Sequence, residues 1–323
     1  MAIRLGFIGT GGIAQGHMDR LTQMEGVEAA AHCDVLLERA EQSAAKFGGQ
    51  AFDDYRRMLD AVQLEGVVIC TPPFAHGDIE AACCDLGLHL LLEKPVAINT
   101  DVARRVQRRV EESGVATVVA YKYRWDDHVN KAREMLRDKA IGLAVGSFWG
   151  GLPGTPWWRV MAESGGQMVE QTTHIVDMAR YLVGDVKTVQ AFYALRGLTE
   201  VPDLDVPDVG TVNLVFESGA VGNISNTCML SGWGTSGLRV MAKGFTLEVV
   251  WGRLTWNAEG EAGEYQQQTD GYQGEDEAFV AAIRGDRSKV NSDYADGAKS
   301  LAVSYAANVS AERGGEVVAV GDI

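Results

Sequence analysis

The first residues whose types and spacing could carry chemistry form a glycine-rich turn. Residues 9–14 read Gly-Thr-Gly-Gly-Ile-Ala, directly follow an apolar run over residues 3–8, and fit the pattern G-x-G-x-x-G/A. Such glycines allow a tight turn and a close approach of the backbone to a pyrophosphate, while the N-terminus of the following helix holds the phosphates. The pattern predicts a dinucleotide site that uses Gly9, Gly11, Gly12, Ile13 and Ala14.

A carboxylate stands about 20 residues beyond the glycines, which is the spacing that dinucleotide sites use. Asp34 ends the second apolar run, residues 27–33, where it could accept hydrogen bonds from a ribose diol. A negative charge there repels a 2′-phosphate, so the sequence favours NAD over NADP as cofactor. Arg39 could complicate this preference for NAD over NADP, although the simpler interpretation is that Arg39 lies on a solvated helix face.

The elements that position these residues alternate between short apolar runs and helical patterns. Such alternation predicts βαβ units and an α/β fold with a doubly wound parallel sheet covered by helices on both faces. The predicted strands cover residues 3–8, 27–33, 66–70, 88–92 and 116–120, and the predicted helices cover 12–24, 36–47, 74–86 and 101–113.

The pattern changes after residue 121. A helix over 129–137 and a segment rich in Gly, Trp and Pro over 150–159 lead into a strong helix over 167–183. Alternating apolar and polar residues then predict an open, mostly antiparallel sheet. Its strands are expected at 188–195, 209–216, 220–228, 239–242, 246–250 and 254–256, before helices at 276–283 and 294–311.

These patterns predict two domains. Residues 1–121 form the Rossmann domain, and residues 122–323 form an α+β domain for substrate binding and oligomerisation, whose last helices could pack back on the first domain.

Composition excludes several classes of protein. The net charge of −15 disfavours a nucleic-acid partner, and no apolar run is long enough to span a membrane or form an export signal. Five cysteines without C-x-x-C spacing argue against a disulfide framework or a structural zinc site. We therefore expect a cytoplasmic protein with reduced thiols and no bound metal; His17, His32 and His128 receive no role.

Three further stretches extend the glycine motif. Thr71-Pro72-Pro73-Phe74-Ala75-His76 and Glu93-Lys94-Pro95 each follow a predicted strand, and residues 165–177, GGQMVEQTTHIVD, begin the main helix of the second domain. Together, and in this order along essentially the whole chain, the four motifs resemble the Gfo/Idh/MocA oxidoreductases, a family that includes glucose–fructose oxidoreductase and inositol dehydrogenases. Residues 293–316 are weakly similar to the closing helix and strand of that family.

The resemblance implies a cytoplasmic NAD(P)-dependent enzyme that acts on sugars, polyols or their derivatives. It also implies that the C-terminal sheet forms the interface of a homodimer or homotetramer. The loop along the cofactor would contain Thr71, Pro72, Pro73 and His76, and Glu93 would accept from the nicotinamide ribose.

Two residues would carry the reaction. The resemblance places Lys94 beside the nicotinamide, where an ammonium group stabilises a developing alkoxide, and the end of a buried strand is where such sheets bind ligands. His174 would be the general acid/base, because its imidazole titrates near neutral pH. Without the resemblance, a satisfied core histidine would be the simpler interpretation of His174.

Two carboxylates accompany His174. Glu170, His174 and Asp177 are spaced i, i+4 and i+7, which predicts one shared helix face. Asp177 could orient or charge-tune the histidine, and it could equally cap or pair elsewhere. The family usually has Asp at the position of Glu170, so the longer side chain leaves the substrates of Asp-containing relatives in doubt.

The substrate side is less determined. Arg124, Trp158, Arg159 and Tyr272 are candidate substrate contacts, since aromatic faces stack on sugar C–H groups and arginine donates to hydroxyls or carboxylates. The tryptophans could instead fill an interdomain seam or an oligomer interface.

Three hypotheses remain open at this point. The leading one is a dehydrogenase acting on a secondary hydroxyl of a sugar, cyclitol or related polyol. Another is an enzyme that uses tightly bound NAD for a transient oxidation, as in glycoside cleavage. The third is an NAD-sensing regulatory protein, against which the presence of both Lys94 and His174 argues.

Overall fold

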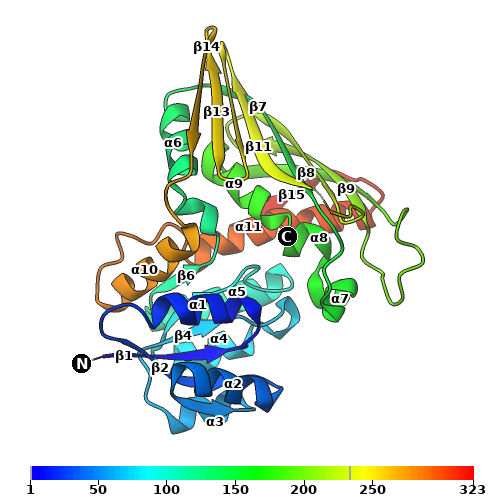
Figure 1. Cartoon of the computed structure of the whole chain (residues 1–323). Coiled ribbons are helices and arrows are strands. Elements are labelled where there is room, and N and C mark those ends of the chain that lie inside the picture. The colour runs from blue at the N-terminus through cyan, green and yellow to red at the C-terminus, as the bar shows by residue number, and fades with distance from the viewer. Residues whose placement is uncertain (1, 233) are drawn as a thin grey trace. The chain divides into compact units, whose positions relative to one another are not determined.

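The computed structural model describes residues 2–232 and 234–323, which divide into two compact units (Figure 1). The first unit comprises Met1–Ala97, Asp101–Lys122 and Gly271–Ala298. The second unit comprises Ile98–Thr100, Tyr123–Asp270 and Lys299–Ile323. In the part of the chain that the structure describes, no helix is both long and apolar enough to cross a membrane.

The first unit contains a parallel sheet with the strand order β3-β2-β1-β4-β5-β6. This is the order of a doubly wound dinucleotide-binding sheet, as the sequence predicted. Its strands are nearly continuous buried runs, because helices cover both faces of such a sheet. The strands are β1 (Ile3–Ile8), β2 (Val27–Cys33), β3 (Gln50–Phe52), β4 (Gly66–Ile69), β5 (His89–Leu92) and β6 (Thr117–Val119).

The helices of this region are α1 (Gly12–Leu21), α2 (Leu37–Phe47), α3 (Tyr55–Ala61), α4 (Asp78–Asp85), α5 (Thr100–Ser113) and α10 (Gly271–Ile283). The short elements β3 and α3 were not predicted, although Asp54 caps α3 by accepting from the backbone N–H groups of Arg56 and Arg57 at 2.9 and 3.1 Å. The sequence predicts one helix over 74–86. The structure instead has a 3₁₀ turn, Pro73–Ala75, and then α4, because Gly77 at φ 124° separates them.

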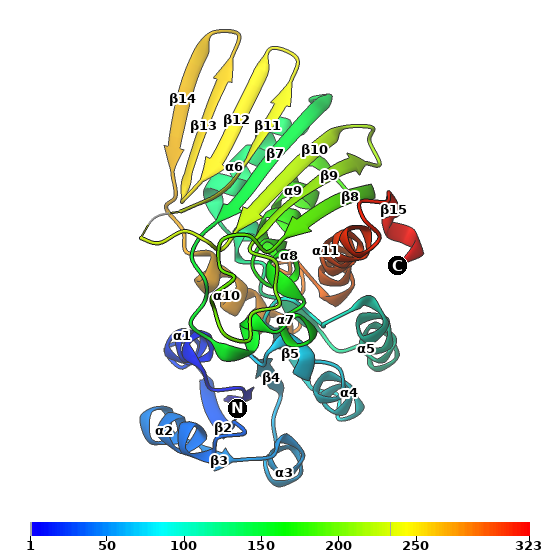
Figure 2. The ribbon, with the colours of Figure 1, turned by 90° about the vertical axis from the view of Figure 1, so that its right-hand side faces the viewer.

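The second unit contains a sheet with the order β14-β13-β12-β11-β7-β10-β9-β8-β15 (Figure 2). Neighbouring strands are antiparallel except for β7 and β10, so the prediction of an open, mostly antiparallel sheet is confirmed. The strands are β7 (Ile141–Trp149), β8 (Val186–Ala194), β9 (Val209–Phe216), β10 (Val221–Thr227), β11 (Thr235–Ala242), β12 (Phe245–Val250), β13 (Arg253–Ala258), β14 (Glu261–Gln266) and β15 (Val318–Ala319).

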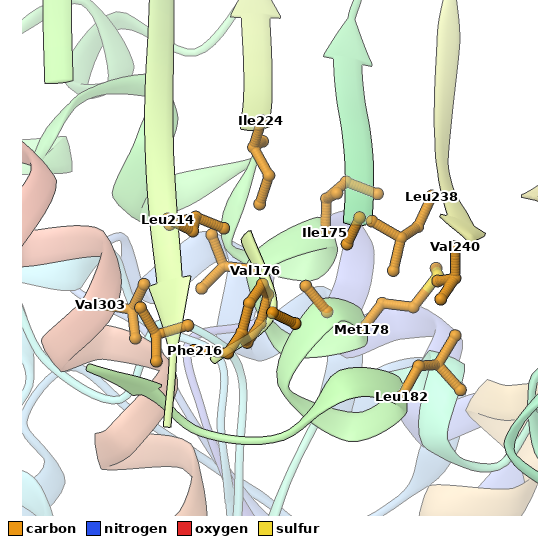
Figure 3. Packing of buried hydrophobic residues seen from close by; sticks show 14 of the residues in the cluster. Ile175, Val176, Met178, Leu182, Leu214, Phe216, Ile224, Leu238, Val240 and Val303 are labelled. Atoms are coloured by element: carbon orange, nitrogen blue, oxygen red, sulfur yellow. The ribbon is translucent and has the colours of Figure 1, made fainter. Parts of the chain in front are cut away.

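The main core of the second unit lies between this sheet and helix α9 (Thr173–Val183). Side chains of α9 meet side chains of the strands and of α11 (Tyr294–Glu312) in one buried cluster (Figure 3). Its labelled members are Ile175, Val176, Met178, Leu182, Leu214, Phe216, Ile224, Leu238, Val240 and Val303. Helix α6 (Asp127–Leu136) adds Val129, Ala132 and Leu136 to the same cluster.

The single helix predicted over 167–183 is two helices in the structure, α8 (Gly166–Glu170) and α9. The N–H groups of Gln171 and Thr172 both donate to the carbonyl oxygen of Gln167, at 3.0 and 2.8 Å, and α9 begins afresh at Thr173. Glu170 and His174 therefore belong to different helices. The prediction that they share one helix face is wrong.

Candidate active site

The glycine turn between β1 and α1 has two kinds of glycine. Gly9 adopts φ +82°, and a Cβ on it would lie 2.5 Å from the carbonyl oxygen of Cys70, so packing inside the chain requires glycine there. A Cβ on Gly11 or Gly12 would meet no atom within 4 Å. Intramolecular packing therefore does not explain these two glycines, and their contact with a pyrophosphate at the N-terminus of α1 stays a prediction.

Asp34 joins the end of β2 to this turn. Its Oδ2 accepts from the backbone N–H and the hydroxyl of Thr10 at 3.0 and 3.1 Å, and its Oδ1 accepts from the N–H of Leu36 at 3.0 Å. A carboxylate offers about four acceptor positions, so these three bonds leave capacity for a ribose hydroxyl. Arg39 lies on the exposed side of α2.

The segment after β4 contains the predicted cofactor loop. His76 is 5% exposed, and its Nδ1 lies 2.5 Å from Oε1 of Glu80, whose Oε2 accepts from the N–H of Gly77. This internal pair fixes the loop that also carries Thr71, Pro72 and the buried Pro73. Contact of these residues with a cofactor stays a prediction.

Glu93 and Lys94 directly follow β5, on the sheet edge where β1 and β4 also end. The carboxyl edge of an open α/β sheet is where ligands bind. Oε2 of Glu93 accepts from the N–H of Lys94 at 3.1 Å, and the Lys94–Pro95 peptide bond is cis. Burial alone would raise the pKa of Glu93, but the hydrogen bond and charge of His17, together with the charge of Lys94, hold it below its ordinary value.

Tyr272, at the start of α10, belongs to the first unit. Its ring lies against two cations: the guanidinium carbon of Arg20 is 5.2 Å and Nζ of Lys122 is 4.3 Å from the ring centroid. Burial, and after it the charges of Glu93 and Glu275, raise the pKa of Tyr272 to about 12. Its predicted contact with substrate is not tested by these interactions.

Sequence reasoning missed a buried cluster in the first unit. His17 is fully buried, and its Nδ1 lies 2.5 Å from Oδ1 of Asp276, whose Oδ2 accepts from Nε of Arg20 at 2.6 Å. Burial opposes protonation of His17, but the hydrogen bonds and charges of Asp276 and Glu93 raise its pKa to about 10. The sequence offered two signals for this cluster. One is the spacing of His17 and Arg20 on one helix, and the other is the adjacent pair of acids, Glu275 and Asp276, on another helix.

The second unit holds His174 and its neighbours. His174 lies in the first turn of α9, and its ring meets the ring of Tyr123 edge to face, with 5.6 Å between centroids. Asp177 is 1% exposed and accepts from Nε and Nη2 of Arg124 at 2.8 and 2.7 Å, and from the hydroxyl of Ser300 at 2.7 Å. Asp177 is thus paired with Arg124 and Ser300, and a role in orienting or charge-tuning His174 stays a prediction.

Glu170, at the end of α8, is tied to Trp158. Nε1 of Trp158 donates to Oε2 of Glu170 at 2.7 Å. The indole is 1% exposed and packs in a small core with Val206 and Cys228, and the adjacent Arg159 is half-buried. The structure therefore ties the Trp158 indole to Glu170, and stacking of its ring on a substrate stays a prediction.

The first unit is thus a Rossmann-type dinucleotide-binding unit, and the second is an α+β unit built on an open sheet. Residues 3–121 match the model of an oxidoreductase family with an NAD-binding Rossmann fold, and residues 129–248 match the GFO/IDH/MocA C-terminal domain. The chain belongs to the Gfo/Idh/MocA family, as its motifs predicted. It is an NAD-dependent oxidoreductase.

Several named proteins are similar to the chain. It is 28% identical over 231 residues to myo-inositol 2-dehydrogenase of Thermotoga maritima, covering 70% of this chain and 68% of that protein. It is 29% identical over 220 residues to levoglucosan dehydrogenase of Pseudarthrobacter phenanthrenivorans, covering 59% of this chain and 56% of that protein. The alignments thus leave 32% of the first relative and 44% of the second unmatched.

Solved structures share the fold over the whole chain. Levoglucosan dehydrogenase in complex with NADH and levoglucosan superposes with a TM-score of 0.87 at 21% identity, covering 100% of both chains. GenD2 from gentamicin A biosynthesis, in complex with NAD, has a TM-score of 0.86 at 22% identity and covers 98% of this chain and 96% of that chain.

Proposed function

We propose that the protein is an NAD-dependent dehydrogenase acting on the CH–OH group of a sugar, cyclitol or related polyol, or reducing the matching ketone. The observation that carries this proposal is the shared carboxyl edge of β1, β4 and β5, where the glycine turn follows β1 and Glu93-Lys94 follow β5, with β4 between these two strands. The names of two relatives, dehydrogenases of inositol and of levoglucosan, support this substrate class.

The chain's own residues fit NAD. The open space at Gly11 and Gly12 would admit the pyrophosphate, and Asp34 would accept from the ribose and repel a 2′-phosphate. When bound, the nicotinamide supplies the hydride acceptor. Glu93 and the loop with Thr71 and His76 would hold the nicotinamide half.

The reaction needs one base and one group that stabilises negative charge. As the substrate carbon loses a hydride to the nicotinamide, a ring nitrogen of His174 would take the hydroxyl proton, leaving a carbonyl group. The ammonium of Lys94 would donate to the same oxygen and stabilise the alkoxide that forms. Action of both groups on one hydroxyl is part of the proposal.

Glu170 would select substrate hydroxyls. Because Trp158 holds Oε2 of this carboxylate, its orientation is set before substrate binds. Arg124, Arg159 and Tyr272 remain predicted substrate contacts, and Asp177 would serve the site by holding Arg124. A homodimer or homotetramer through the C-terminal sheet, and a cytoplasmic location, also stay predictions.

The test is a cofactor and substrate screen. We would mix the protein with NAD or NADP and a panel of cyclitols, aldoses, sugar acids and glycosides, and follow the absorbance of reduced nicotinamide. Turnover with NAD should fall at least about 100-fold in His174→Asn, which is the size of a general-base effect, and similarly in Lys94→Met. Lys46→Ala, in an exposed pair with Asp19, is the matched control and should keep full activity.

Two outcomes would contradict the proposal. Turnover that survives in both variants would remove their assigned roles. NAD binding without turnover of any panel member, in either direction, would count against a simple dehydrogenase of sugars or polyols.

A further inference from the structure

A glycine leaves a space on the inner face of the second sheet. Tyr193 of β8, Gly210 of β9 and Asn226 of β10 lie opposite one another, so their side-chain positions share one face. This face also carries Ile224, which packs in the core against α9. A Cβ on Gly210 would collide with Oδ1 of Asn226 and lie 2.9 Å from Cδ1 of Tyr193. Glycine therefore keeps the space between the tyrosine and the asparagine open.

This space belongs to a small cavity inside the second unit. Asn308 of α11 lines the cavity together with Tyr193 and Asn226, and Gln167 and Met168 of α8 line it from another side. About 10 Å³ of the cavity is open to the centre of a water molecule, which is room for one.

Three polar atoms of the lining residues have no hydrogen-bond partner among the described residues. They are the hydroxyl oxygen of Tyr193 and the Oδ1 atoms of Asn226 and Asn308. Both asparagines are 5% exposed. Buried polar atoms are nearly always paired, because an unpaired one loses its bonds to water without replacement. Three such atoms on residues that line one cavity indicate a ligand.

Neighbouring carbonyl groups determine which way the amides face. A backbone carbonyl can only accept, so Nδ2 of Asn308, at 2.8 Å from the oxygen of Gly165, leaves Oδ1 as the remaining atom. In the same way, Nε2 of Gln167 donates to the carbonyl oxygen of Thr227 at 2.9 Å. Oε1 of Gln167 then accepts from Nδ2 of Asn226 at 2.9 Å, which leaves Oδ1 of Asn226 without a donor. The remaining set is two acceptors and one hydroxyl.

One water molecule matches this set. It would donate its two protons to the two amide oxygens and accept from the hydroxyl of Tyr193, which gives three hydrogen bonds, the usual number for a buried water. No acidic side chain lines the described cavity, so nothing there would balance the charge of a bound cation.

We propose that this cavity binds one structural water, and that the water, through Asn226 and Gln167, positions the turn that follows Glu170. The carbonyl oxygen of Gln167 accepts from the N–H groups of Gln171 and Thr172, so this residue holds the turn directly. Asn226 and Gln167 are positioning residues, and their effect on substrate rests on the proposed function of Glu170.

A crystal structure of the full-length protein at high resolution tests the water directly. We expect one peak of electron density within about 2.6–3.2 Å of the Tyr193 hydroxyl and of both Oδ1 atoms. Well-ordered density for the lining side chains without this peak would overturn the water site.

The stability of Tyr193→Phe gives an independent reading in solution. If the hydroxyl donates to a water, its loss should raise the equilibrium constant for unfolding about 2–10-fold in urea, because a bridging water is nearly as good a partner as a protein group. Tyr181→Phe, which loses a direct bond of 2.7 Å to Oδ1 of Asn130, is the matched control and should change in the same direction. An unchanged or lower constant in Tyr193→Phe would show an unpaired hydroxyl and overturn the proposal.

Kinetics test the positioning role. Asn226→Asp keeps an oxygen toward the water but removes the donor to Gln167. Its KM for the sugar or polyol should rise about 10-fold, whereas its affinity for NADH should stay within about twofold of the wild type. Asn223→Asp, the same change on the opposite face of β10, should keep both values. An unchanged KM in Asn226→Asp, or an equal rise in Asn223→Asp, would overturn the positioning role.

Failure of this site and failure of the proposed function are distinguishable. A wild-type protein without turnover would contradict the proposed function, while the electron density and the stability of Tyr193→Phe would still decide whether the water is bound.

Discussion

Acid should destabilise the second unit through one buried histidine. His128 lies in α6, is 1% exposed, and has no hydrogen-bond partner for either ring nitrogen among the described residues. Burial lowers the pKa of His128 to about 4, and the neighbouring charge of Asp127 opposes this only in part. Protonation of the His128 imidazole is therefore unfavourable in the folded protein, whereas in the unfolded chain the imidazole is half protonated at a pH of about 6.5.

The direction and the size of the change in the free energy of unfolding follow from this difference between the folded and unfolded pKa of His128. Because the folded pKa is lowered, the stability contribution is complete above about pH 6.5 and is lost as the pH falls toward 4. At pH 5 the unfolded imidazole is almost fully protonated while the folded one is mostly neutral, which costs about 2 kcal/mol. At pH 4 the loss reaches about 3 kcal/mol.

Urea unfolding followed by tryptophan fluorescence measures this loss. All seven tryptophans of the sequence fall between residues 125 and 256, so the signal reports on the region that contains His128. His128→Leu removes the titration and both unpaired nitrogens, and should be at least as stable as the wild type at pH 7.5. The difference in the free energy of unfolding between His128→Leu and the wild type should be larger at pH 5 than at pH 7.5, by about 2 kcal/mol in favour of the variant.

A second variant separates titration from polarity. His128→Asn stays polar but does not titrate, so it should abolish the same pH dependence without the gain in stability at pH 7.5. Equal losses of stability in the wild type and His128→Leu between pH 7.5 and pH 5 would refute the reasoning.

Two further substitutions test the site. Gly9→Ala places a methyl group against the carbonyl of Cys70 and should destabilise the protein by about 1–3 kcal/mol in thermal unfolding. Gly12→Ala should keep the stability of the protein but weaken NADH binding in a fluorescence titration. Unchanged affinity of this variant for NADH would contradict a pyrophosphate at that position. Asp177→Asn removes the charge of one partner from a buried ion pair with Arg124 and should cost about 3–5 kcal/mol in urea unfolding. Wild-type stability of this variant would contradict that expectation.

The first unit could be predicted because its signals are local. The bounds of β1 and β2 agree with the predicted runs, since each is a buried apolar stretch that ends at a turn or an acidic residue. The glycine motif needs a strand before it and a helix after it, and both are present. The family and its NAD cofactor followed from the motifs in order, and the family models confirm them.

Strand β7 shows what local signals leave out. The central strand of the second sheet contains glycines, which read as breaks in a pattern of apolar alternation. A Cβ on Gly146 would lie 2.6 Å from Cγ2 of Ile175, so this glycine lets α9 pack closely on the sheet. The reason for the residue is a contact with a helix 29 positions away, which periodicity along one segment does not reveal.

The break between α8 and α9 has a similar origin. Apolar spacing continues across residues 167–183, so the sequence predicts one helix and one face. The break shows only in the hydrogen bonds, where two successive N–H groups turn to Gln167. Nε2 of Gln167 in turn donates to the carbonyl oxygen of Thr227 at 2.9 Å, which ties this turn to β10. A tertiary contact thus accompanies the change of direction that places Glu170 and His174 on separate helices.

The buried cluster around His17 was missed for a stronger reason. On α1 alone, a histidine beside Ala14, Met18 and Leu21 on the buried face looks like an ordinary core residue. Its chemistry is set by Asp276, which is 259 positions away and enters the first unit only because the segment Gly271–Ala298 folds into it. A buried imidazole between two carboxylates holds a proton tightly, which is why the pKa of His17 is raised to about 10 despite its burial. Burial raises the pKa of the neighbouring Glu275 well above its ordinary value, and the charges of Glu93 and Asp276 add to this shift, so no residue near His17 in the sequence signals how the cluster holds its protons.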